Sequence, residues 1–298
     1  MYSLLGFLNG VLLASMMSIN GRLTSALGPL VATVVIHVIG GAAALVPFFL
    51  TRPHGRIWGH RPIWVYLGGV VGVGTTIFQC AAILTLSLTS VVALGLLGQV
   101  VSSLAIDAWG LFGAERRRPS ATALVSLAFA AVGIGIMLSG GVSAGLAVVC
   151  ALCSGVCIVT SRSTNARLAT FADGTTSTLL NYVTALPVAL VVAVMTTSPS
   201  ALPGIVEAGS TLPVWAYAGG VLSVGVIAAY NVVVPRLSAV SLTLLVFAGQ
   251  VICGLVVDVV ARGGSLDASV VGGLVVTAGV VVSRLADLVL ASSKKAKL

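Results

Sequence analysis

The sequence contains PIWVYLGGVVGVG at residues 62–74 and a second copy, PVWAYAGGVLSVG, at residues 213–225. The register between the two copies continues without a gap beyond this stretch, and it pairs Gly98 with Gly249, Gln99 with Gln250 and Asp107 with Asp258. Earlier in the chain, Asn20-Gly21-Arg22-Leu23 matches Asn165-Ala166-Arg167-Leu168. We therefore predict two copies of one unit, residues 1–140 and residues 141–298, of which the second ends in a short basic tail.

The composition assigns both copies to a membrane. Of 298 residues, 15 are Lys or Arg and 7 are Asp or Glu, so charged residues make up 7% of the chain, against about 25% in soluble domains. Hydrophobic residues make up 58%, and the mean hydropathy is +1.16. These values exclude a water-soluble domain, a disordered chain, a secreted disulfide scaffold and a nucleic-acid-binding protein, and they predict an integral membrane protein.

The apolar residues fall into ten runs, each near the ~20 residues that a helix needs to cross the hydrocarbon layer. The runs are residues 3–20, 29–50, 62–83, 88–106, 121–139, 143–160, 176–196, 213–234, 239–257 and 268–290. They are continuous rather than alternating, which favours helices over barrel strands. The sequence thus predicts an all-α integral membrane protein with ten transmembrane helices, five in each copy.

Five spans per copy is an odd number, so the second copy is expected to lie upside down relative to the first. Inverted repeats are typical of secondary transporters, whose substrate site lies near the middle of the membrane between the repeats. Alternation through ten spans puts Arg22 and Arg262 on one side and thirteen basic residues on the other. The thirteen are Arg52, Arg56, Arg61, Arg116, Arg117, Arg118, Arg162, Arg167, Arg236, Arg284, Lys294, Lys295 and Lys297. Because basic loops stay in the cytoplasm, both termini are predicted to be cytoplasmic.

Several of these stretches resemble a known family. They are Asn20-Gly-Arg-Leu23, Trp64-Val-Tyr-Leu-Gly-Gly69, and Leu97-Gly-Gln-Val-Val-Ser-Ser-Leu-Ala-Ile-Asp107 with its repeat at residues 248–258. The chain resembles the YdcZ-like branch of the drug/metabolite transporter superfamily, in a form with two fused five-helix units. Family members often carry a glutamine four residues before the first-span asparagine, where this chain has Met16 and Ser161. The resemblance implies transport of a small molecule, but it does not identify the substrate.

Polar side chains within apolar spans are candidates for the transport pathway, because each needs a partner in hydrocarbon. The predicted substrate-binding residues are Gln99, Gln250, Asn9, Gln79, Tyr230 and Asn231. The resemblance and the positions of the polar residues predict that the first, third, fourth, sixth, eighth and ninth spans line one cavity. The repeat predicts that Gln99 and Gln250 both face it. The alternative for the two glutamines is a hydrogen bond between helices, which contributes ~0.6 kcal/mol in a membrane.

Other polar residues suggest coupling or structural roles. His37 lies within the second span and is a candidate to carry a coupling proton, with a neutral, hydrogen-bonded histidine as the alternative. Asp107 and Asp258 lie at span ends, and we expect them to cap helices or to pair with arginines, in a structural or gating role shared with Asn20 and Asn165. Cys150, Cys153 and Cys157 share a helical face but have no histidine or carboxylate nearby, so no metal site is predicted.

The sequence as a whole predicts an exporter or exchanger in the cytoplasmic membrane that works by alternating access. No acidic residue lies at mid-span and aromatic residues make up only 6%, so a neutral polar or zwitterionic metabolite is favoured over a cationic drug. We expect no enzyme activity, no cofactor and no nucleic-acid partner; the partners are the small molecule and the bilayer, and the protein is a monomer or a homodimer. The alternatives are an intramembrane enzyme acting on a lipid-linked substrate and a non-transporting accessory protein.

Overall fold

The computed structural model describes residues 1–51, 62–86, 88–116, 121–139 and 145–262, together with single positions between 268 and 286. The helices are α1 (Tyr2–Leu27), α2 (Pro29–Thr51), α3 (Gly68–Ile83), α4 (Leu88–Trp109), α5 (Ala121–Ser139), α6 (Gly145–Ala172), α7 (Gly174–Thr196), α8 (Leu202–Ser210), α9 (Ala218–Val233) and α10 (Ala239–Arg262). Within these ranges there are helices and no strand, and seven spans are long and apolar enough to cross a membrane. The all-α membrane fold is therefore confirmed at this level. The run predicted at 268–290 lies outside the described residues except at single positions.

α1 and α6 continue well beyond the apolar runs that predicted them. α1 continues to Leu27 and ends at Gly28, where φ is +76°, and α6 continues to Ala172 and ends at Asp173, where φ is +92°. No proline interrupts either extension, and the added turns bury polar side chains against neighbouring helices instead of exposing them to water. The predicted span ends at residues 20 and 160 were therefore too early.

The repeated motif forms the same local structure in both copies. Pro62 precedes a short 3-10 helix, η1 (Ile63–Tyr66), and Pro213 precedes its equivalent, η4 (Val214–Tyr217). Each 3-10 turn leads into a helix of 16 residues, α3 and α9 respectively. The remaining 3-10 helices are η2 (Leu111–Gly113), η3 (Pro199–Ala201) and η5 (Val234–Arg236).

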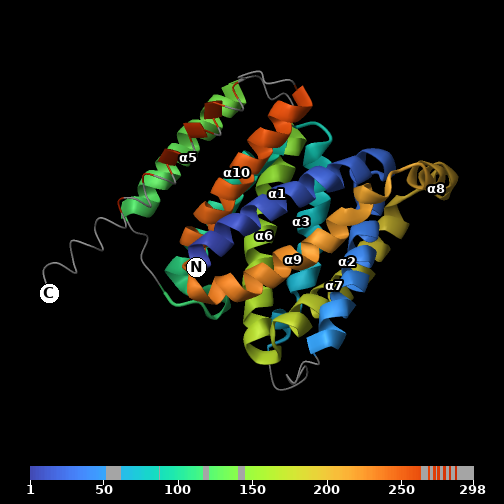
Figure 1. Ribbon diagram of the computed structural model, residues 1–298, viewed down its shortest axis with the longest axis horizontal. Helices are drawn as coiled ribbons and strands as arrows, with labels where there is room; N and C mark the ends of the chain where they lie inside the picture. Colours follow the sequence, from blue (N-terminus) through green and yellow to red (C-terminus); the bar gives the residue numbers. More distant parts are fainter. Residues whose placement is uncertain are drawn as a thin grey trace, which may run out of the picture.

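The segment between α7 and α9, where the sequence predicted no span, contains η3 and the short helix α8. Leu202 and Val206 of α8 are exposed, and the hydroxyl of Tyr217 donates to the carbonyl of Gly209 at 2.7 Å. This bond ties the end of α8 to η4 and so to the repeated motif. α8 lies at the edge of the bundle (Figure 1).

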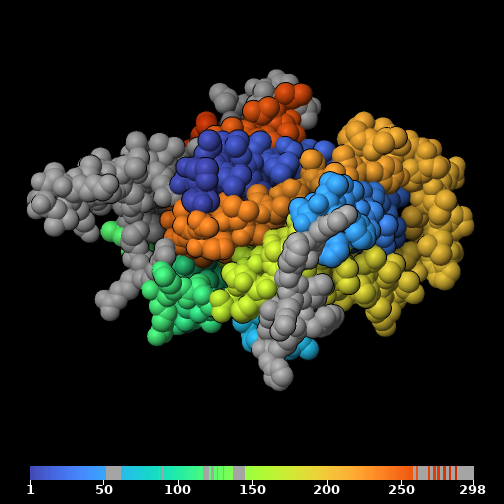
Figure 2. Space-filling view, turned by 60° about the horizontal axis from the view of Figure 1, so that its bottom comes forward, coloured from blue at the N-terminus to red at the C-terminus, as the bar shows by residue number. Residues whose placement is uncertain are grey.

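The main helix contacts come in matched pairs. α1 packs against α9 and α10, while α6, its counterpart in the repeat, packs against α3 and α4. Figure 2 shows α1 lying between α9 and α10 on one face of the molecule. α2 packs against its counterpart α7, and α4 against its counterpart α10. Each half thus packs mainly against the other, and α5 lies at the margin, in contact with α4 and α10.

Glycines permit the closest of these contacts. A Cβ atom added to Gly10 of α1 would overlap the carbonyl oxygen of Val246 in α10. A Cβ atom added to Gly155 of α6 would overlap the carbonyl oxygen of Gly95 in α4. The two contacts are equivalent in the repeat, and both show backbones in direct contact, as small residues allow in membrane helices.

Candidate functional site

A central pocket of about 110 Å³ lies among six helices. α1, α2 and α3 of the first half line it together with α6, α7 and α9, their counterparts in the second half. The sequence predicted α4 and α10 as lining helices and did not predict α2 and α7. The prediction was wrong here because α4 and α10 pack closely against α6, α1 and each other, which leaves none of their side chains in the lining described for this pocket.

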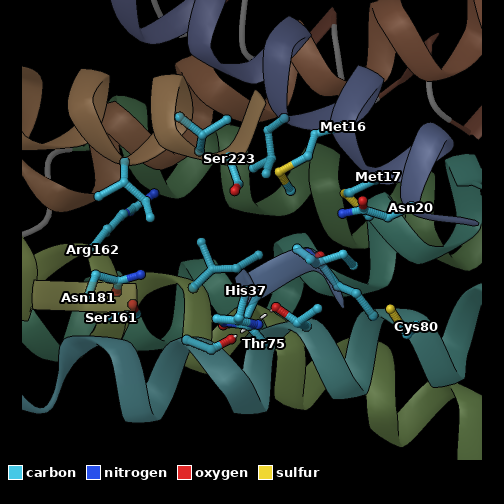
Figure 3. Close-up of a pocket in the computed structure, with 18 of the residues that line it drawn as sticks. Met16, Met17, Asn20, His37, Thr75, Cys80, Ser161, Arg162, Asn181 and Ser223 are labelled. Atoms are coloured by element: carbon cyan, nitrogen blue, oxygen red, sulfur yellow. Dashed lines mark hydrogen bonds between the residues drawn. The ribbon is translucent and has the colours of Figure 1, made fainter. Parts of the chain in front are cut away.

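The two ends of the pocket differ in chemistry. Figure 3 shows Arg162, Ser161 and Asn181 at one end and Met17, Asn20 and Cys80 at the other. His37 and Thr75 lie between them, and Ser223 faces them from α9. The pocket therefore offers a cation and hydrogen-bond donors at one end, and sulfur atoms with an amide at the other.

Arg162 is the charged residue of this lining, and it is only 3% exposed. Its Nη2 donates to the hydroxyl of Thr243, to the carbonyl of Ala239 at 3.3 Å and to the hydroxyl of Ser103 at 3.4 Å. Its Cζ lies 5.5 Å from the centre of the Tyr230 ring. Nη1 is buried and has no hydrogen-bond partner among the described residues.

The sequence had predicted Arg162 to be one of the thirteen cytoplasmic topology charges, and the structure corrects this. Arg162 lies inside α6 rather than in a loop, because the helix continues for ten residues past it to Ala172, and its side chain is buried. A charge directly after an apolar run looks like a flanking anchor, which is why it was missed. The available signal was the first helix-breaking sequence, Asp173-Gly174, which allows a helix that contains Arg162.

A hydrogen-bonded network holds the Arg162 end of the pocket. Nδ2 of Asn165 donates to Oδ1 of Asn181 at 2.8 Å, and the hydroxyl of Ser161 donates to the carbonyl of Gly68 at 2.7 Å. A Cβ atom on Gly68 would overlap Oδ1 of Asn165, just as a Cβ atom on its counterpart Gly219 would overlap Oδ1 of Asn20. The two asparagines therefore hold α6 against α3 and α1 against α9, which fits a structural role for both.

His37 is 4% exposed and lines the pocket. Its Nδ1 lies 2.8 Å from the carbonyl oxygen of Thr33, and because a carbonyl only accepts, Nδ1 carries the proton in this bond. The ring meets that of Tyr182 edge-on with centres 6.1 Å apart, and the Tyr182 and Ser223 hydroxyl oxygens are 2.6 Å apart. His37 is thus positioned by α2 and α7 at the pocket wall.

The predicted site residues divide into two groups. Those that line the pocket are Gln79, Tyr230, His37, Asn20 and Asn165. Those that lie outside its lining are Gln99, Gln250, Asn9 and Asn231. Sequence reasoning also missed five polar residues of the lining, because they fall within or beside apolar runs without a motif; they are Thr75, Ser161, Asn181, Tyr182 and Ser223.

Gln99 and Gln250 do not face a shared cavity that the structure describes. Each is 1% exposed, and neither side-chain oxygen has a hydrogen-bond partner in the described residues. The reason is the preceding glycine: a Cβ atom on Gly98 would overlap the carbonyl oxygen of Leu152, and one on Gly249 that of Phe7. These contacts bring α4 onto α6 and α10 onto α1, and they enclose the amides between helices.

Asn9 and Asn231 join helices. Nδ2 of Asn9 donates to the carbonyl of Val226 at 3.4 Å. Nδ2 of Asn231 donates at 3.1 Å both to the carbonyl of Gly174 and to the hydroxyl of Thr178. These bonds give Asn9 and Asn231 a role in helix packing within the described residues.

A second cavity, of about 260 Å³, lies beyond the Arg162 end of the pocket. Its charged lining residues are Asp107, Glu115, Arg162 and Arg167. The two carboxylate oxygens of Asp107 accept the N–H groups of Ala239 and Val240 at 3.1 Å each, so that Asp107 caps α10, as predicted for a span-end acid. Its counterpart Asp258 lies in α10, with a side chain outside the described part of the chain. Arg162 lines both cavities.

Comparison with known proteins agrees with this architecture. A solved structure described only as "Crystal structure of protein" superposes with a TM-score of 0.67, at 17% identity, over 97% of this chain and 98% of that one. At this identity the likeness shows the fold alone. No curated protein matches the sequence. The family described as "Putative inner membrane exporter, YdcZ" matches residues 1–136 and residues 146–283, one match for each predicted copy. The chain belongs to this YdcZ family of drug/metabolite transporters.

Proposed function

We propose that the protein is a secondary transporter that exports or exchanges a small polar metabolite across the cytoplasmic membrane. The observation that carries the proposal is the central pocket, which has a mostly apolar lining with a few polar side chains and Arg162, contributed by counterpart helices of the two halves. Transporters built from repeats place their substrate at such an interface. The family assignment supports a role in membrane export.

Residues 1–140 and residues 141–298 form the two halves in this proposal, inverted relative to each other and completed by a tenth span at 268–290. Support comes from the matched contacts of α1 with α9 and α10 and of α6 with α3 and α4. Because these interfaces are equivalent, loosening one set while tightening the other would expose the pocket to each side in turn. In the topology predicted by the basic residues, the second cavity lies on the cytoplasmic side.

The substrate is expected to fill the pocket, so occluding the pocket should stop transport. A Cβ atom on Gly72 would face the pocket, 3.5 Å from the Ser161 hydroxyl and 3.6 Å from Oδ1 of Asn181. Gly72→Leu should therefore abolish binding of compounds found by a thermal-shift screen of metabolites, and abolish their uptake into proteoliposomes. Gly135→Leu is the matched control, because a Cβ atom at Gly135 has no neighbour within 4 Å. Uptake by Gly72→Leu at the rate of the unmodified protein would contradict this site.

A further inference from the structure

We propose that the substrate carries a carboxylate and that this carboxylate binds Arg162 at the end of the central pocket. This proposal rests on the transport function proposed above and defines the class of substrate. A guanidinium group stays protonated in proteins, so the pocket wall holds a full positive charge. The sequence alone favoured neutral or zwitterionic solutes because no acidic residue lies at mid-span and aromatic residues are few, and it placed this arginine among the topology charges.

Among the described residues, the central pocket itself supplies no acidic side chain to balance the charge of Arg162, and the carboxylate of Asp107, which attracts that charge, lies in the second cavity. Asp107, which shares the second cavity with Arg162, directs both carboxylate oxygens to the backbone N–H groups of Ala239 and Val240. A buried charge with no counter-charge on the pocket side is costly in a membrane protein and marks a candidate functional site.

The free donors point to an oxygen-rich anion. Nη2 of Arg162 is used by Thr243, Ala239 and Ser103, whereas Nη1 is buried and has no partner among the described residues. The ring of Tyr230 lies against the guanidinium, and its hydroxyl interacts with Arg162, so this hydroxyl is not a free donor. Nη1 alone carries two N–H groups, and charge-assisted hydrogen bonds to a carboxylate would satisfy them.

The repeat shows that helix packing does not require an arginine here. The counterpart of Arg162 in the first half is Met17, whose sulfur lies 3.8 Å from Nε2 of Gln250. Both side chains lie on helices with equivalent packing, α1 on α10 and α6 on α4. Only the second half carries a charge at this position, and Arg162 lines both cavities. This arrangement fits a role in binding a solute that moves between the two cavities.

The described pocket lining contains no acidic side chain, and this limits which other charged groups the substrate can carry. An ammonium group on the solute would find no carboxylate there. We therefore infer that monoanionic carboxylates bind better than zwitterions of the same size. Lactate, alanine and lactamide form a matched series for this comparison, since they are similar in size and differ in charge.

The experiment is a thermal-shift titration of the purified full-length protein in detergent with lactate, benzoate, their amides and alanine. The carboxylates should raise the melting temperature, while the amides and alanine should not. Arg162→Met, which installs the residue found in the other half, should weaken carboxylate binding about 10-fold or more, and Arg162→Lys should restore part of it. Arg22→Met is the control, because Arg22 is exposed on α1 and lines neither cavity.

Three results would overturn the proposal: no stabilisation by either carboxylate, equal stabilisation by the amides or alanine, or an unchanged response in Arg162→Met. If Arg162→Met fails to fold, the comparison of carboxylates with amides on the unmodified protein and the response of Arg162→Lys decide the question. Uptake of radiolabelled benzoate into proteoliposomes tests transport separately. Carboxylate binding that depends on Arg162, without uptake, would support the anion site and contradict the transport function. Uptake of neutral solutes by Arg162→Met would support the transport function and contradict the anion site.

Discussion

At the scale of single residues, the buried polar atoms without partners fall into two environments. Those of Asn20, Thr75 and Arg162 belong to residues that line the central pocket. Those of Asn9, Gln99, Asn231 and Gln250 belong to residues at helix interfaces. An unmade hydrogen bond costs roughly 1–3 kcal/mol, which a bound solute can offset only at the pocket. The two groups should therefore respond differently to substitution.

Gln79 and Gln99 provide the comparison. Gln79 lines the pocket, and Gln99 is enclosed between helices. We expect Gln79→Leu to weaken substrate binding by ~2–10-fold, the scale of one hydrogen bond, and Gln99→Leu to leave the affinity unchanged while altering stability by ~0.6 kcal/mol. Titrations that follow the melting temperature measure both quantities. Loss of affinity in Gln99→Leu, with the fold intact, would restore the original prediction that this glutamine contacts substrate.

His37 is expected to couple transport to protons, because imidazole is the side chain in the pocket lining whose ordinary pKa lies closest to neutral. In His37→Gln, the amide keeps a hydrogen-bond donor for the Thr33 carbonyl but cannot exchange a proton. Uptake into proteoliposomes driven by an imposed pH gradient should fall to the rate seen without a gradient. Substrate exchange at equal pH should persist, which serves as the control. Gradient-driven uptake at the unmodified rate would remove His37 from coupling.

At the scale of helices, glycines set how closely the elements approach. α6 lies directly on α4 at Gly155, where a Cβ atom would overlap the Gly95 carbonyl oxygen. Backbone atoms cannot yield as a flexible side chain does, so overpacking has to separate the two helices. The same reasoning applies to α1 and α10 at Gly10, where the overlap is with Val246. The pocket walls therefore depend on contacts that are remote from the pocket.

We expect Gly155→Ala to lower stability by ~1–3 kcal/mol, the usual cost of overpacking. Gly135→Ala, in the marginal helix α5, is the control, because nothing lies within 4 Å of the added Cβ atom. Thermal unfolding of both variants in the same detergent measures the difference. Equal melting temperatures for the two variants would show that α4 and α6 separate without cost.

The apolar runs predicted the helices well, because hydrocarbon requires about 20 apolar residues for each span. They did not predict where α1 and α6 end, since helices continue past the apolar run when neighbouring helices bury their polar side chains. Arg162 and Asn165 were therefore read as flanking residues. α8 was missed because its nine residues are too few for a span.

At the scale of the whole molecule, the repeat predicted which helices are counterparts, and the matched contacts of α1 and α6 follow the same register. It did not predict that α2 and α7 rather than α4 and α10 line the pocket, because lining depends on packing distances that sequence does not give. The second half has Arg162 where the first half has Met17, and this difference breaks the symmetry of the two halves. That asymmetry gives the two ends of the pocket their different chemistry.

Orientation in the membrane is the last property that the repeat implies. With Arg162 buried, twelve basic residues remain on the predicted cytoplasmic side, against Arg22 and Arg262 on the other. Three predicted spans, 213–234, 239–257 and 268–290, separate Thr211 from Leu298. A reporter that is active only outside the cytoplasm should therefore be active when fused after Thr211 and inactive when fused after Leu298.

Each alternative outcome of the fusion experiment has a distinct structural meaning. Equal activity at both sites would require an even number of spans after Thr211, and residues 268–290 would then not cross the membrane. Activity at Leu298 alone would reverse the whole molecule and place the second cavity, with Asp107 and Arg167, outside the cell. Only activity at Thr211 alone is consistent with a pocket that meets cytoplasmic solutes first at Arg162, because Arg162 then lies between the central pocket and the cytoplasmic cavity.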